Sequence, residues 1–93
     1  MKVTVRLQNK GDREIGLEVE PWGEYYRIAP GAQVDLVIAG PIVGEPNADP
    51  QSNGVIDLQY ETDLITVYGW RSAEIEVVGA TMAPWPTGTG EKK

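Results

Sequence analysis

Apolar and polar residues alternate along much of the first 78 residues, which is the pattern of β-strands with one buried and one solvated face. Residues 3–8 and 15–20 each carry an apolar side chain at every second position, and the turn-forming run from Asn9 to Asp12 separates them. We therefore expect these two segments to pair as a β-hairpin.

The alternation returns in several short segments after residue 24, at residues 25–28, 33–38, 56–61 and 74–77. Residues 64–68 are apolar on both faces, which predicts either a central strand or a strand covered by the long loop. Pro30-Gly31 fits the middle of a type II turn, because proline fixes the first φ and glycine accepts the positive second φ. No segment has a helical apolar period of useful length.

About seven short strands predict an antiparallel β-sandwich of Greek-key type, with a small β-barrel as the alternative. We expect one domain over residues 1–79, with the first and last strands at sheet edges and a long loop rich in proline and glycine over residues 40–54. Residues 80–93 predict a flexible tail, and whether Trp85 docks is left open.

The stretch from Glu20 to Gly31 is the corner of the chain, with three aromatic side chains in five residues. Tyr26 and Tyr60 fall in phase with core positions, so we expect them to be buried. The other aromatic residues between 22 and 70 fall out of phase or in turns. On one interpretation, Trp22 plugs an open end of the sandwich and Trp70 covers an edge. On the other, these aromatic residues form an exposed patch for a partner.

The charge of the chain narrows the range of partners. Eight basic and fourteen acidic residues give a net charge of −6, which disfavours nucleic acid and anionic membrane surfaces. The longest apolar run, residues 36–39, is too short to cross a bilayer, and the N-terminus shows no leader pattern. Without cysteine no disulfide supports the fold, so a cytoplasmic location is expected.

The residue inventory argues against an enzyme. The chain has no histidine and no cysteine, which excludes classical triads and thiol chemistry, and we expect no cofactor and no catalytic residue. Glu18 and Glu20 share one strand face about 7 Å apart, a spacing that glycosidases use. Glycosidase carboxylates, however, come from opposite sides of a cleft, so the solvated side of a strand is the simpler interpretation for both residues.

No resident metal is expected either. The long loop carries oxygen-bearing side chains of the kind that calcium prefers, but their spacing differs from that of a calcium loop, so a solvated loop is favoured and calcium binding is a minor hypothesis. These side chains are Glu45, Asn47, Asp49 and Ser52.

Two resemblances concern the fold. The strand, Asn9 turn, strand and Pro30-Gly31 turn resemble the opening of cupredoxin-like and immunoglobulin-like sandwiches, although the histidine and cysteine ligands of a copper site are missing. More narrowly, three motifs resemble a group of small uncharacterised bacterial proteins over most of residues 3–78: Glu20-Pro21-Trp22-Gly23 followed by Tyr26, Pro30-Gly31, and Tyr68-Gly69-Trp70. This second resemblance implies no activity.

Two functional hypotheses follow. The first is a non-enzymatic binding or assembly module, whose partner is a second copy of the chain or another protein. Its candidate surface comprises Trp22, Tyr25, Arg27, Tyr68, Trp70 and Arg71. The alternative is a binder of a small ligand or carbohydrate, in which Trp22 and Trp70 stack on a sugar while Glu18 and Glu24 accept its hydrogen bonds.

Overall fold

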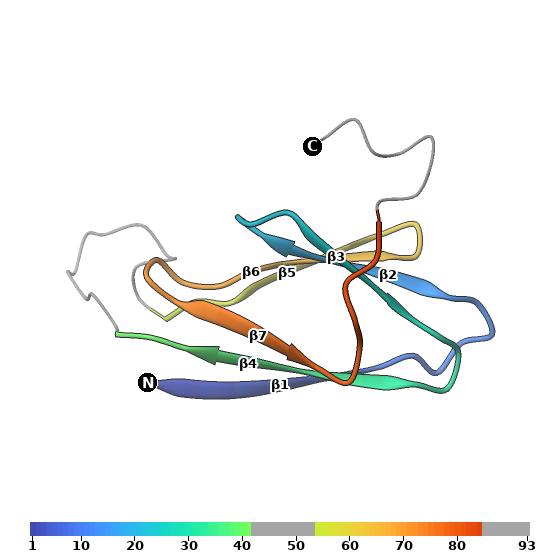
Figure 1. The fold of residues 1–93 in the computed structure, drawn as a ribbon, viewed down its shortest axis with the longest axis horizontal. Coiled ribbons are helices and arrows are strands. Elements are labelled where there is room, and N and C mark those ends of the chain that lie inside the picture. The colour runs from blue at the N-terminus through green and yellow to red at the C-terminus, as the bar shows by residue number, and fades with distance from the viewer. Residues whose placement is uncertain (42–53, 85–93) are drawn as a thin grey trace.

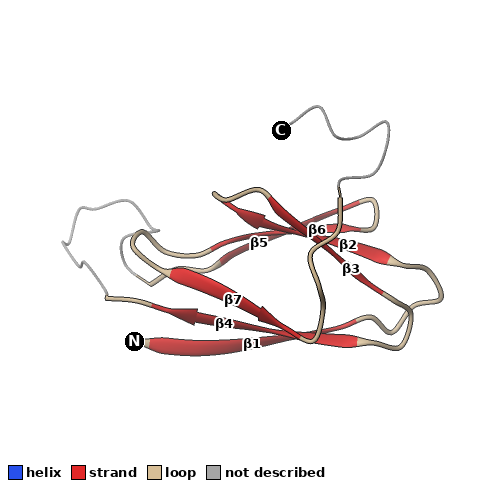
Figure 2. Cartoon of the chain, in the orientation of Figure 1, coloured by secondary structure: helices blue, strands red, loops and turns tan. Residues whose placement is uncertain are grey.

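The computed structural model describes residues 1–41 and 54–84, which contain seven strands and no helix (Figures 1 and 2). Within these two ranges, therefore, no helix is available that could span a membrane. The expected all-β fold is confirmed. The strands are β1 (Lys2–Gln8), β2 (Ile15–Glu20), β3 (Glu24–Ile28), β4 (Gln33–Ala39), β5 (Asp57–Glu61), β6 (Leu64–Tyr68) and β7 (Glu74–Val78).

The strands form two separate sheets that pack as a sandwich. One sheet has three strands in the order β1-β4-β7, and the other has four in the order β3-β2-β6-β5. Neighbouring strands are antiparallel except for β2 and β6, which run parallel. The predicted β-sandwich is confirmed, but it is not wholly antiparallel, because β2 and β6 form a parallel pair. β6 is a central strand, which was one of the two expectations for residues 64–68. The two sheets share no strand, so the chain does not adopt the barrel alternative.

The predicted hairpin of the first two segments is wrong. β1 pairs with β4 from Lys2↔Ala39 to Gln8↔Gln33, whereas β2 lies in the other sheet between β3 and β6. The alternation of apolar residues fits either pairing, because it shows which residues share a face but does not choose the neighbouring strand.

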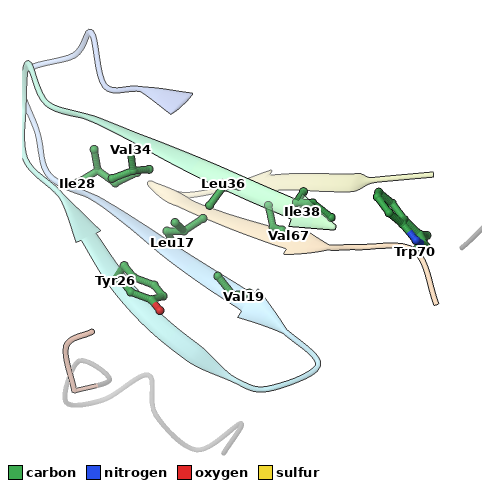
Figure 3. Packing of buried hydrophobic residues seen from close by; sticks show 9 residues of the cluster. All are labelled: Leu17, Val19, Tyr26, Ile28, Val34, Leu36, Ile38, Val67 and Trp70. Atoms are coloured by element: carbon green, nitrogen blue, oxygen red, sulfur yellow. The ribbon is translucent and has the colours of Figure 1, made fainter. Parts of the chain in front are cut away.

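The core lies between the sheets and receives side chains from both (Figure 3). Burying each large apolar side chain of this kind contributes roughly 1.5–3 kcal/mol to the free energy of folding. Tyr26 belongs to the core, as predicted. The buried cluster comprises Leu17, Val19, Tyr26, Ile28, Val34, Leu36, Ile38, Val67 and Trp70.

The second tyrosine that we expected in the core is not buried: 64% of the Tyr60 surface is exposed. Tyr60 and Leu58 lie opposite Ile65 and Val67 in the β5·β6 ladder, so they share the inward face of the sheet with buried Val67. They are exposed because β5 is the edge strand of the wider sheet and extends past the cover that the three-stranded sheet provides.

Asn9 fixes the point where the chain leaves β1 and crosses to the other sheet. Its buried side-chain Nδ2 donates hydrogen bonds to the carbonyls of Arg13 (2.8 Å) and Ile28 (2.9 Å), and its Oδ1 accepts one from the Gly11 N–H (3.0 Å). Its own N–H donates to the Ala32 carbonyl (2.9 Å). One residue therefore joins β1 to the β1–β2 connection and to the end of β3.

The connection from β3 to β4 is the predicted Pro30-Gly31 turn. Gly31 has a φ of +80°, and the Ala32 N–H donates to the Ala29 carbonyl at 3.0 Å. The Gly31 N–H also donates to the Asn9 carbonyl (2.8 Å). This turn and the Asn9 side chain therefore hold the same end of the sandwich.

After β7 the chain crosses from the three-stranded sheet to the edge of β3 (Figure 2). Met82 forms an isolated antiparallel bridge with Tyr26, and the Ala83 N–H donates to the Tyr25 carbonyl (2.8 Å). Trp85 and the remainder of the expected tail lie outside the described residues, as does most of the predicted 40–54 loop.

We expect Asn9→Asp to lower the free energy of unfolding by about 2–4 kcal/mol, because it keeps the size and the acceptor of the side chain but removes two donated hydrogen bonds to part-buried carbonyls. Urea unfolding measures the change. Gln8→Glu makes the same chemical change at the exposed neighbouring position and should shift the midpoint far less. Equal shifts for the two variants would refute the role given to Asn9.

Candidate functional site

The corner after β2 places Trp22 at the surface. β2 ends at Glu20, the Glu20–Pro21 peptide bond is cis, and Pro21 has no N–H to continue a ladder. Gly23 has a φ of +72°, and its N–H donates to the Val19 carbonyl at 2.9 Å, which closes the turn. Trp22 lies within this turn with 48% of its surface exposed.

The connection from β6 to β7 places the other tryptophan inside. Trp70 is only 2% exposed and belongs to the core, where it lies at one end of the cluster beyond Ile38 and Val67 (Figure 3). Its indole Nε1 donates to the Pro41 carbonyl (3.0 Å), and the Ala73 N–H donates to the Trp70 carbonyl (3.0 Å). Trp70, and not Trp22, therefore fills this end of the sandwich.

A cleft of about 550 Å³ lies between the corner and this connection. Pro21 and Trp22 line it from the corner, and residues 68–74 line it from the end of β6, the turn and the start of β7. Tyr68 and Trp70 give it aromatic walls, while Arg71, Ser72 and Glu74 add polar groups. The two tryptophans thus line one cleft, one with an exposed ring and the other as part of the core.

The remaining two residues of the predicted surface lie outside the cleft lining. Tyr25 is opposite Glu18 and Arg27 is opposite Gly16 in the β2·β3 ladder, so both side chains project from the outer face of the four-stranded sheet. Arg27 is exposed. Tyr25 is buried, because its ring covers Gly16 so closely that a Cβ there would lie 2.8 Å from Tyr25 Cε1.

The expectation that Glu18 and Glu20 are solvated is wrong, since Glu18 is fully buried and Glu20 is 6% exposed. Both lie on β2, an interior strand between β3 and β6, so side chains of two neighbouring strands surround them. The Thr66 hydroxyl donates to Glu18 Oε1 (3.3 Å). Sequence reasoning missed this buried position, because charged residues at alternate positions of a strand are normally solvated.

Glu18 and Glu24 lie on opposite faces of the four-stranded sheet. Glu24 is opposite inward-facing Val19, and its Oε1 accepts a hydrogen bond from the Tyr26 hydroxyl (2.9 Å). The two carboxylates cannot therefore bind one sugar together, as the carbohydrate hypothesis required.

The described residues contain no group of three potential metal-binding side chains. The four residues behind the calcium hypothesis lie outside the described part of the chain. Comparison with known proteins yields no matching family model, no matching curated protein and no matching solved structure. The sandwich and bacterial resemblances stay predictions, and function must be argued from the residues themselves.

We expect Trp70→Ala to lower the free energy of unfolding by about 3–5 kcal/mol, because it empties one end of the core. Trp22→Ala should lower it by no more than about 1 kcal/mol, because half of that ring is already in water. Urea unfolding of the two variants beside the wild type makes the comparison. If Trp22→Ala proves as destabilising as Trp70→Ala, the corner is part of the core and the account of the cleft fails.

Burial, together with the hydrogen bond to Glu24, raises the pKa of Tyr26 to about 12. The pKa of an unfolded tyrosine is about 10, so the stability that this group contributes is fully present below about pH 10 and is lost as the pH rises toward 12. Urea unfolding across this range should therefore show a decline that is smaller in Tyr26→Phe. Absorbance titration of the tyrosines is the control. If the tyrosine that is lost in Tyr26→Phe ionises near pH 10, the raised pKa assigned to Tyr26 is wrong.

Proposed function

We propose that the chain is a non-enzymatic binding module that takes a protein partner at the cleft beside Trp22. The observation that carries the proposal is the exposure of Trp22 at a cleft whose opposite wall is fixed by the core. Trp70 belongs to that wall, and its hydrogen bond to Pro41 ties the wall to the end of β4. A partner side chain entering the cleft would therefore meet a surface that is already ordered, which lowers the entropic cost of binding.

The residue types in the cleft favour a protein partner. Tryptophan, tyrosine and arginine dominate the binding energy of protein interfaces, and Trp22, Tyr68 and Arg71 all line the cleft. The cleft of about 550 Å³ lies within the size range of small-ligand pockets, so the residue types, and not the volume, favour a protein partner. Tyr25 and Arg27 lie outside this cleft, so the proposal does not use them.

The carbohydrate alternative is less well supported, because it needed two rings that stack on one sugar. Trp70 offers no free ring face, since its side chain is enclosed in the core. Of the two tryptophans, only Trp22 could stack, and the two carboxylates proposed to bind the same sugar lie on opposite sides of the sheet.

The test compares wild type, Trp22→Ala and the control Val78→Ala, which truncates an apolar residue of similar exposure (47%) on β7. Each tagged protein is used to capture proteins from lysate of its source cells. Candidate partners are those that wild type and Val78→Ala retain but Trp22→Ala does not. Calorimetry with the purified partner should then show at least a 30-fold weaker Kd for Trp22→Ala, about 2 kcal/mol, and an unchanged Kd for Val78→Ala.

Two outcomes would contradict the proposal. In the first, Trp22→Ala retains every captured partner with unchanged affinity. In the second, the wild type binds a neutral oligosaccharide from a panel, the binding is lost in Trp22→Ala, and no protein is retained. The second outcome would favour the carbohydrate alternative.

A further inference from the structure

β1 and β5 are free edge strands on the same side of the sandwich. Among the strands of residues 1–41 and 54–84, β1 pairs only with β4, and β5 pairs only with β6. On the other side, three residues separate Val78 at the end of β7 from Met82, which bridges to Tyr26 on β3. Such a short segment spans no more than about 14 Å, so β7 lies beside β3. β1 and β5 are the other edge strands of the two sheets, so they share the remaining side. They lie together toward the end where Trp70 binds the Pro41 carbonyl, whereas at the opposite end Asn9 binds the Ile28 carbonyl and brings β1 toward β3.

The β1/β5 side carries apolar side chains that the described chain leaves uncovered. On β5, Leu58 and Tyr60 both face inward, yet they are 46% and 64% exposed. On β1 the inward-facing Val3 and Val5 are only partly buried. The corresponding edge strand on the other side, β3, has its inward-facing Ile28 buried. The difference between the two sides therefore lies in β5 compared with β3, because Ile75 and Val77 on β7 are partly buried just as Val3 and Val5 on β1 are.

The outward faces of the two edges carry opposite charges. β1 presents Lys2 and Arg6, of which Arg6 is paired with Asp35 on β4, whereas β5 presents Asp57 and Glu61. Pairing β5 with another β5 in antiparallel fashion about its centre would set each Asp57 against a Glu61, which is repulsive. Pairing β1 with β5 sets basic residues against acidic ones.

We propose that two copies of the chain associate about a two-fold axis parallel to the strands, so that β1 of each copy pairs with β5 of the other. β1 and β5 run in the same direction (Figure 1), and rotation about such an axis preserves that direction, so the new pairs are parallel. The axis sets the three-stranded sheet of each copy beside the four-stranded sheet of the other. The two β1·β5 pairs therefore form together, and the assembly closes as a dimer.

One register satisfies both faces of the new pairs. Setting Val3 beside the partner's Leu58 and Val5 beside the partner's Tyr60 joins the apolar strips on the inward faces. The same register sets Lys2 beside the partner's Asp57 and Arg6 beside the partner's Glu61 on the outward faces. Each three-stranded sheet then continues into the four-stranded sheet of the other copy, and the inward-facing residues of β5 become covered.

Analytical ultracentrifugation of the full chain over a range of concentrations tests this dimer. We expect a monomer–dimer equilibrium that Asp57→Lys weakens about tenfold, because Lys2 then faces a like charge at both copies of the contact. Lys2→Glu should weaken it similarly, and the double variant Lys2→Glu/Asp57→Lys should restore it. Glu76→Lys, the same charge reversal on β7, is the control and should leave the equilibrium unchanged. Circular dichroism checks that each variant is folded.

Four outcomes would overturn the inference: a monomer up to about 1 mM, a dimer that Asp57→Lys strengthens, a double variant that stays as weak as the single ones, or larger open assemblies. Trp22→Ala separates this inference from the proposed function, since the cleft contributes nothing to the β1·β5 pairing. A dimer that persists in Trp22→Ala while partner capture is lost supports both claims, and a dimer lost in Trp22→Ala overturns this one.

Discussion

The candidate site depends on the burial of Trp70 at one end of the core. Its ring lies beyond Ile38 and Val67, and its indole N–H bonds to the Pro41 carbonyl just after β4. One side chain thus joins the ends of strands from both sheets. Because Trp70 occupies this space, Trp22 at the neighbouring corner remains half exposed, and the cleft between them has one wall built from the core.

The unequal width of the two sheets explains the second distinctive surface. Three strands face four, and the extra width falls at β5, where Leu58 and Tyr60 face inward yet remain exposed. The opposite side is closed by the segment that carries Met82 to β3. The Trp22 cleft and the β1/β5 side therefore arise from two different features of the fold, and a protein partner and a second copy of the chain need not compete.

The sequence pattern predicts the strands well and their surroundings poorly. Alternation located six of the strands, an apolar run located β6, and Pro30-Gly31 located a turn, because all of these signals are local. The hairpin, Tyr60 and Glu18 were predicted wrongly for one shared reason: period two assigns residues to a face but does not reveal which strand lies alongside or what covers that face. The burial of Trp70 had no local signal either, since it follows a glycine within a turn and depends on the space that the facing sheet leaves open.

Acrylamide quenching of tryptophan fluorescence tests whether Trp70 is buried and Trp22 exposed. The Trp85→Phe background suits it, because Trp22 and Trp70 are the two remaining tryptophans there. We expect a readily quenched component that disappears on further replacement of Trp22 by phenylalanine, leaving Trp70 emission that acrylamide barely quenches. If the readily quenched component survives that replacement, Trp70 is the accessible ring, and the arrangement of core and cleft described above is wrong.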